Sequence, residues 1–181
     1  QRHRLRDGGA GPLGGIDVEI YTFNGEWWDH SGWVQTQEDG TYNFGGVADG
    51  TVCRLWFSDW TGTWAAEAYA DASSWQWGDD VTASIDTPAE GVDATLSHAG
   101  SITGIVSGDG VPLVGAPVAA GPYDADTDTW DPYFFTETDE SGGYTFSGLK
   151  PGVAYLVQAG DYSGTYAWTM WTSGGTGTDD W

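Results

Sequence analysis

The chain has 181 residues, and its 27 acidic side chains against five basic ones give a formal net charge of −22 at pH 7. Such an acidic surface repels phosphate backbones, so the composition argues against nucleic-acid binding. No run of about 18 apolar residues occurs, so neither a transmembrane helix nor membrane insertion is expected.

The first predicted strand is basic. It covers residues 3–7, and from Arg2 onward the arginines Arg2, Arg4 and Arg6 alternate with His3 and Leu5. Alternation of apolar and polar residues, which is typical of half-buried strands, then continues along the first half of the chain. Further strands are predicted at 16–23, 33–37, 41–45, 52–58, 64–70, 81–85 and 92–97. Glycine-rich turns separate them, and no long amphipathic helical pattern is present, so the chain is predicted to be all-β.

The second half of the chain repeats the first. Residues 11–18 align with 111–118, an offset of 100 (111 minus 11), and residues 40–47 align with 142–149, an offset of 102 (142 minus 40). The repeat predicts strands at 101–107, 116–121, 134–138, 143–146, 154–159 and 166–171. We therefore expect two tandem β-sandwich domains of the immunoglobulin-like or transthyretin-like kind, covering residues 1–99 and 100–181.

The second repeat is expected to lack its last strands. Position 181 corresponds to position 79 of the first repeat (181 minus 102), before the strands at 81–85 and 92–97 have counterparts. A sandwich without these strands would expose a groove with unpaired backbone groups. A strand from a neighbouring copy could fill it, and the basic segment carrying Arg2, Arg4, Leu5 and Arg6 is the predicted assembly strand. The alternative is a truncated chain whose own strands once filled the groove.

The turn-rich blocks at 104–118 and 138–152 carry a family resemblance. The run Thr138-Asp139-Glu140-Ser141-Gly142-Gly143-Tyr144-Thr145-Phe146, which continues to Gly152, resembles the carboxypeptidase-regulatory-like domain. That family is close to the B-type repeats of collagen adhesins and to transthyretin-like sandwiches. The resemblance implies a β-sandwich fold. It also implies a role as a stalk or filament subunit of surface proteins, or as an accessory of secreted enzymes.

Alternating acids mark one loop of the second repeat. Asp124, Asp126 and Asp128 could surround a calcium ion with carboxylate oxygens, although the glycine and the distal glutamate of an EF-hand loop are missing. A solvated acidic loop without a ligand is the alternative reading. Calcium is the one cofactor that the sequence suggests.

Tryptophans are the second unusual feature, with twelve in the chain. Trp27, Trp28, Trp33 and Trp130 fall at turn-like positions beside polar residues. Exposed tryptophans serve as anchors of protein interfaces and as platforms for sugar rings. These four tryptophans are therefore candidates for contact with a protein partner or a glycan, and the alternative is that they take part only in local packing.

No arrangement of residues typical of an active site is visible in the sequence, so a non-enzymatic protein is predicted. The leading hypothesis is an extracellular or cell-surface structural protein, a subunit of a filament, sheath or stalk that associates with identical copies. The alternative is a carbohydrate-binding or spacer region of a larger secreted enzyme or adhesin, which would bind a glycan.

Overall fold

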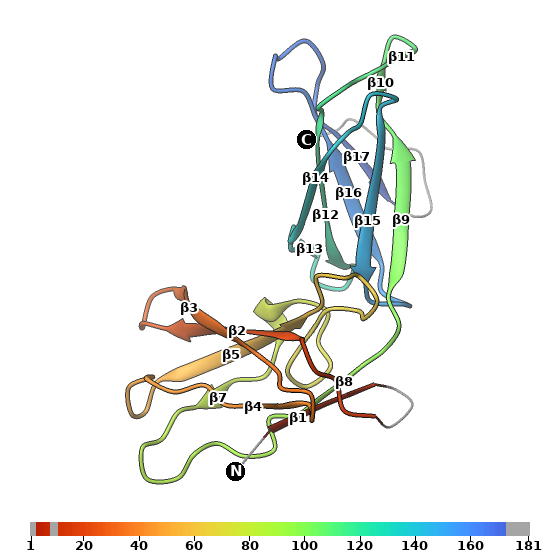
Figure 1. Ribbon diagram of the computed structural model, residues 1–181. Helices are drawn as coiled ribbons and strands as arrows, with labels where there is room; N and C mark the ends of the chain where they lie inside the picture. The colour runs from red at the N-terminus through yellow and green to blue at the C-terminus, as the bar shows by residue number, and fades with distance from the viewer. Residues whose placement is uncertain (1–2, 8–10, 173–181) are drawn as a thin grey trace. The chain divides into compact units, whose positions relative to one another are not determined.

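The computed structural model describes residues 3–7 and 11–172 and is all-β, as predicted. Its one helical element in these ranges is the 3-10 turn η1 (Trp75–Trp77). The chain forms two compact units (Figure 1). The first comprises residues 1–100 with the short segment Gly148–Pro151, and the second comprises Ser101–Ser147 and Gly152–Trp181.

The first unit is a sandwich of a five-stranded and a three-stranded sheet. The larger sheet has the order β3-β2-β5-β6, with β7 also paired to β5, and the smaller has the order β4-β1-β8. The strands of the larger sheet are β2 (Asp17–Phe23), β3 (Trp28–Gln35), β5 (Val52–Ser58), β6 (Glu67–Ala68) and β7 (Val81–Thr82). Those of the smaller sheet are β1 (His3–Asp7), β4 (Thr41–Tyr42) and β8 (Ala94–Leu96).

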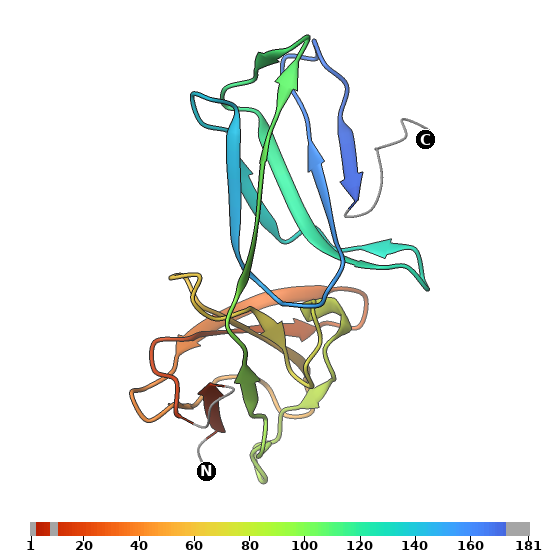
Figure 2. The ribbon, with the colours of Figure 1, turned by 90° about the vertical axis from the view of Figure 1, so that its right-hand side faces the viewer.

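The second unit repeats this plan with a smaller sheet of two strands, β15-β9. Its larger sheet has the order β13-β12-β16-β17, with β14 also paired to β12 (Figure 2). The strands are β9 (Gly100–Ile105), β12 (Pro117–Asp124), β13 (Thr129–Trp130), β14 (Phe134–Glu137), β15 (Gly143–Leu149), β16 (Tyr155–Ala159) and β17 (Thr169–Thr172). A short hairpin of β10 (Ser107–Gly108) and β11 (Val111–Pro112) completes it.

The two larger sheets share one register. Val18 pairs with Phe57 between β2 and β5, and Val118 pairs with Ala159 between β12 and β16, which reproduces the sequence offsets of 100 (118 minus 18) and 102 (159 minus 57). On the far edge, the pair Phe57–Glu67 corresponds to Ala159–Thr169 at the offset of 102 (169 minus 67). The repeat seen in the sequence is therefore a repeat of strand pairing.

The core of the first unit forms where its two sheets face each other. Strands β2 and β5 contribute Val18, Ile20, Leu55 and Phe57, and the smaller sheet contributes residues such as Leu96. Cys53 lies among them as a buried free thiol, and burial raises its pKa. Apolar side chains on the inner faces of both sheets thus hold the sandwich together.

Candidate functional site

The smaller sheet of the first unit shows how a complete edge is built. Strand β1 lies between β4 and β8, and it pairs with β8 in parallel orientation. Ala94 and Leu96 of β8 are buried, whereas Thr95 between them is exposed. The Tyr42 hydroxyl of β4 donates a hydrogen bond to the carbonyl oxygen of Val92, just before β8. The third strand is therefore held both by its apolar side chains and by its backbone.

In the second unit, β9 takes the place of β1. It pairs with β15, whose Gly143-Tyr144 matches Thr41-Tyr42 of β4 at the offset of 102 (144 minus 42). Within the part of the chain that the structure describes, no strand pairs with the other edge of β9. Among the described residues nothing fills the position that β8 has in the first unit, and a groove lies there.

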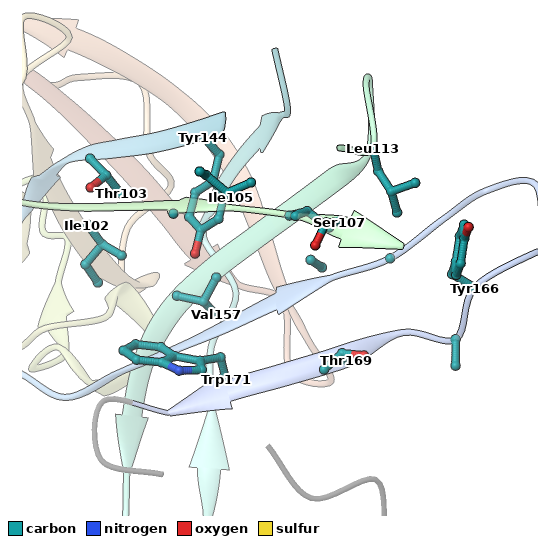
Figure 3. A pocket seen from close by; sticks show the side chains of 15 residues that line it. Ile102, Thr103, Ile105, Ser107, Leu113, Tyr144, Val157, Tyr166, Thr169 and Trp171 are labelled. Carbon is teal, nitrogen blue, oxygen red and sulfur yellow. The ribbon is translucent and has the colours of Figure 1, made fainter. Parts of the chain in front are cut away.

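This β9 groove has a volume of about 570 Å³ and lies between β9 and the strands β16 and β17 (Figure 3). Its lining carries no Asp, Glu, His, Lys or Arg and consists of Ile102, Thr103, Gly104, Ile105, Val106, Ser107, Leu113, Tyr144, Val157, Ala159, Gly160, Tyr166, Ala167, Thr169 and Trp171. Val157 is buried, but Ile105 is 72% exposed and Trp171 is 49% exposed. The groove is thus an apolar surface beside an unpaired strand edge.

Tyr144 supplies one of the hydroxyl groups that line the groove. Figure 3 shows its ring crossing β9 with the hydroxyl directed towards Val157, and burial raises the pKa of this hydroxyl. The equivalent Tyr42 hydroxyl bonds to Val92, whereas the Tyr144 hydroxyl has no hydrogen-bond partner among residues 3–7 and 11–172. The sequence comparison aligned these two tyrosines but could not show that they differ in this way.

A second groove, of about 450 Å³, lies on the other side of the second unit's larger sheet and is rich in aromatic side chains. Trp130 and Trp168 line it with the exposed rings of Phe135 and Tyr162. The indole N–H of Trp130 is buried and has no hydrogen-bond partner in the described structure. We call it the aromatic groove. Trp130 was predicted from the sequence, but the other three rings were not, because they come from separate strands and loops.

The other predicted tryptophans belong to the first unit, and two of them do not lie in turns. Trp28 and Trp33 are part of strand β3, and Trp27 directly precedes it. Trp28 packs under the guanidinium of Arg54, whose Cζ is 4.4 Å from the ring centroid, so it takes part in local packing. Trp27 and Trp33 are each 59% exposed. These two side chains remain available for an interface or a glycan.

The predicted calcium loop is a tight hairpin between β12 and β13. Its Asp124 carboxylate accepts hydrogen bonds from the Asp126 N–H and the Thr127 hydroxyl, and Asp128 accepts one from the Tyr123 hydroxyl. In the described ranges no group of three or more His, Cys, Asp or Glu side chains is arranged to hold a metal ion. Calcium binding at this loop stays a prediction, which melting curves recorded with calcium and with a chelator will test.

The structure describes most of the predicted assembly strand. Arg4, Leu5 and Arg6 belong to β1, which pairs with β4 and β8 of its own unit, and Arg2 lies outside the described residues. Use of this segment as a donor to another copy stays a prediction, and it would require β1 to leave these pairings.

Comparison with known proteins gives distant similarities. No family model matches the sequence, and no curated protein matches it. Among solved structures, a streptococcal ancillary pilin is similar over 97% of this chain and 58% of its own, with 13% identity and a TM-score of 0.34. A mutant of the shaft pilin SpaA from Lactobacillus rhamnosus GG is similar over 95% of this chain and 92% of its own, with 12% identity and a TM-score of 0.33.

The chain thus spans a little over half the length of the streptococcal pilin. Neither similarity assigns the chain to a family. No helix among the described residues is both long and apolar enough to cross a membrane.

Proposed function

We propose that this chain is a non-enzymatic structural protein of the cell surface or extracellular space, a tandem β-sandwich subunit of a filament, sheath or stalk. In this proposal identical copies join by strand addition at the second unit. The open edge of β9 beside an apolar groove is the observation that carries the proposal. An unpaired strand edge invites another strand, and head-to-tail addition does not close on itself, so it builds a linear polymer.

A substitution at the edge of β9 tests this function. The Val106 N–H bonds to Gly142 next to β15, and backbone groups alternate along a strand, so the N–H of Ile105 points to the open edge. Ile105→Pro removes that donor, and proline is tolerated where an edge N–H faces solvent. We expect concentration-dependent linear polymers of the native protein in sedimentation and electron microscopy, and their loss in Ile105→Pro.

Ile105→Val is the matched control and should polymerise as the native protein does, because it keeps the edge N–H. A native protein that stays monomeric at high concentration would overturn the function, and so would an Ile105→Pro variant that still polymerises. Deleting residues 1–7 tests the predicted donor separately. Loss of polymers with an intact second unit would support that segment, and unchanged polymers would exclude it.

The aromatic groove supports a second candidate function, glycan binding as part of a larger secreted protein. Its rings offer stacking surfaces for sugar rings. On a glycan array, we expect binding that is lost in Trp168→Ala and kept in Trp60→Ala, which changes an exposed tryptophan of the first unit. Absence of any glycan signal from the native protein would exclude this candidate.

A further inference from the structure

We propose that the β9 groove binds an extended peptide segment that runs parallel to β9 and presents a small apolar residue and, two positions later, a leucine. This inference deepens the proposed function. It rests on that function only in taking the bound segment to come from another copy of the chain. The required chemistry follows from the first unit, where the segment Val92–Leu96 occupies the equivalent position.

The first unit defines orientation and spacing. Leu5, Arg6 and Asp7 of β1 pair in parallel with Ala94, Thr95 and Leu96 of β8. Ala94 and Leu96 point to the core because side chains two positions apart share one face of a strand. A segment beside β9 would therefore direct its first and third side chains towards Val157 and the ring of Trp171, which lie across the groove.

Tyr144 supplies the polar anchor. In the first unit the Tyr42 hydroxyl bonds to the carbonyl of Val92, two residues before Ala94. The Tyr144 hydroxyl lines the groove and makes no hydrogen bond with the described residues. A bound segment would gain a hydrogen bond by offering this hydroxyl a carbonyl oxygen two residues before its small apolar side chain, as Val92 does for Tyr42.

The lining also discriminates between donors. It contains no charged side chain, so it cannot offset the burial of one. The predicted donor Gln1–Asp7 would turn either its arginines or the set His3, Leu5 and Asp7 towards the groove. With either face turned inwards, this segment would place charged side chains against an apolar surface. A segment with the pattern of Ala94 and Leu96 would place only apolar side chains there.

The test uses capped synthetic peptides added to the full chain. The probe has the sequence of residues 91–97, the control carries Leu96→Asp, and a third peptide has the sequence of residues 1–7. We expect the probe to slow hydrogen exchange of the amides of Thr103 and Ile105, and the Leu96→Asp peptide to leave their exchange unchanged. The peptide of residues 1–7 should also leave it unchanged.

Two variants of the protein test the anchor. Tyr144→Phe should weaken binding of the probe about five- to tenfold, the loss of one hydrogen bond of ordinary strength. Tyr162→Phe, which removes an exposed hydroxyl elsewhere in the same unit, should leave the affinity unchanged. Unchanged affinity in Tyr144→Phe, equal binding of the Leu96→Asp peptide, or protection of β9 only by the peptide of residues 1–7 would each overturn the inference.

The peptide assay and the polymer assay can fail independently. If the protein is monomeric but binds the probe, this inference holds and the filament proposal is wrong. If the protein forms polymers but does not bind the probe, the filament proposal holds and this inference is wrong.

Discussion

Thr36 and Thr138 make the same pair of hydrogen bonds in their two units. The Thr36 hydroxyl accepts from the Ile16 N–H at 2.9 Å and donates to the Leu13 carbonyl at 2.8 Å. The Thr138 hydroxyl accepts from the Ala116 N–H at 2.8 Å and donates to the Leu113 carbonyl at 2.6 Å. Each hydroxyl therefore joins the end of one strand, β3 or β14, to the turn before its partner strand, β2 or β12.

Replacing Thr138 by valine should lower the free energy of unfolding of the second unit by about 1–3 kcal/mol, because the buried Ala116 N–H loses its acceptor. Thr136→Val is the control, since the hydroxyl of Thr136 makes only a 3.5 Å contact with the Glu137 carbonyl. Its effect should stay within about 0.5 kcal/mol. Chemical denaturation of both variants measures the difference, and equal losses would contradict the role of Thr138.

Asp59 and Asp161 hold matching loops. The Asp161 carboxylate accepts from the N–H and hydroxyl of Ser163 and from the N–H groups of Thr165 and Tyr166. Asp59 accepts the equivalent bonds from Thr61, Thr63 and Trp64. The hydrogen bonds from Ser163 hold the pKa of Asp161 below its usual range.

This shift predicts a pH dependence. Because the pKa is lower in the folded state, the Asp161 contribution to stability is present above the ordinary aspartate pKa of about 3.9 and is lost as the pH falls through the folded-state value. In unfolding experiments across this range, Asp161→Asn should be less stable than the native protein at neutral pH, and the gap should shrink in acid. Asp126→Asn makes the same change of charge and controls for it. A gap that persists in acid would contradict the assignment.

Glycine permits a close approach in the larger sheet of the second unit. Gly121 lies within β12, where a glycine weakens a strand unless the backbone needs the space. A Cβ atom at Gly121 would lie 1.8 Å from the Asp131 carbonyl oxygen, so the segment after β13 passes directly over the strand. This crossing positions Trp130 and Pro132 at the aromatic groove.

Gly121→Ala should therefore destabilise the second unit by about 3 kcal/mol or more, because the added methyl group meets backbone rather than a movable side chain. Gly45→Ala is the matched control, since no atom lies within 4 Å of a Cβ there. Its effect should remain within about 0.5 kcal/mol. Thermal unfolding distinguishes the two, and a neutral Gly121→Ala would show that the segment after β13 can move away.

At the level of elements, the alternation of apolar and polar residues predicted most strands but not the full length of some of them. The predicted strands at 3–7 and 52–58 agree with β1 and β5. Strand β3 begins at Trp28 rather than at 33, because the aromatic segment pairs with the end of β2. The sequence did not predict this part of β3, because it directly follows Asn24 and Gly25, which are typical of turns.

For the whole molecule, the net charge of −22 is the dominant electrostatic property. Like charges at this density repel one another and oppose the compact state. Raising the salt concentration from about 0.1 M to about 1 M shortens the Debye length from about 10 Å to about 3 Å.

Thermal stability should therefore rise with salt over this range, and sodium and potassium chloride should act equally because screening depends on ionic strength. Melting temperatures measured in both salts test this. A melting temperature that falls with salt would show that attractive surface ion pairs outweigh the repulsion.

The sequence by itself determined the all-β class, the two offsets of the repeat and the positions of most strands. These follow from neighbouring residues, because period-2 alternation and glycine turns act within a few positions of the chain. It also predicted that the second repeat carries a groove beside its first strand.

Only the tertiary structure decided which strands and side chains surround that groove. The hydroxyl of Tyr144 has no hydrogen-bond partner among the described residues although Tyr42 has one, and Trp28 lies under Arg54 while Trp27 stays exposed. Asp124 and Asp128 accept hydrogen bonds within their own hairpin and do not converge on a common point with Asp126. Each outcome depends on strand pairing and packing between residues distant in sequence, which local alternation does not encode.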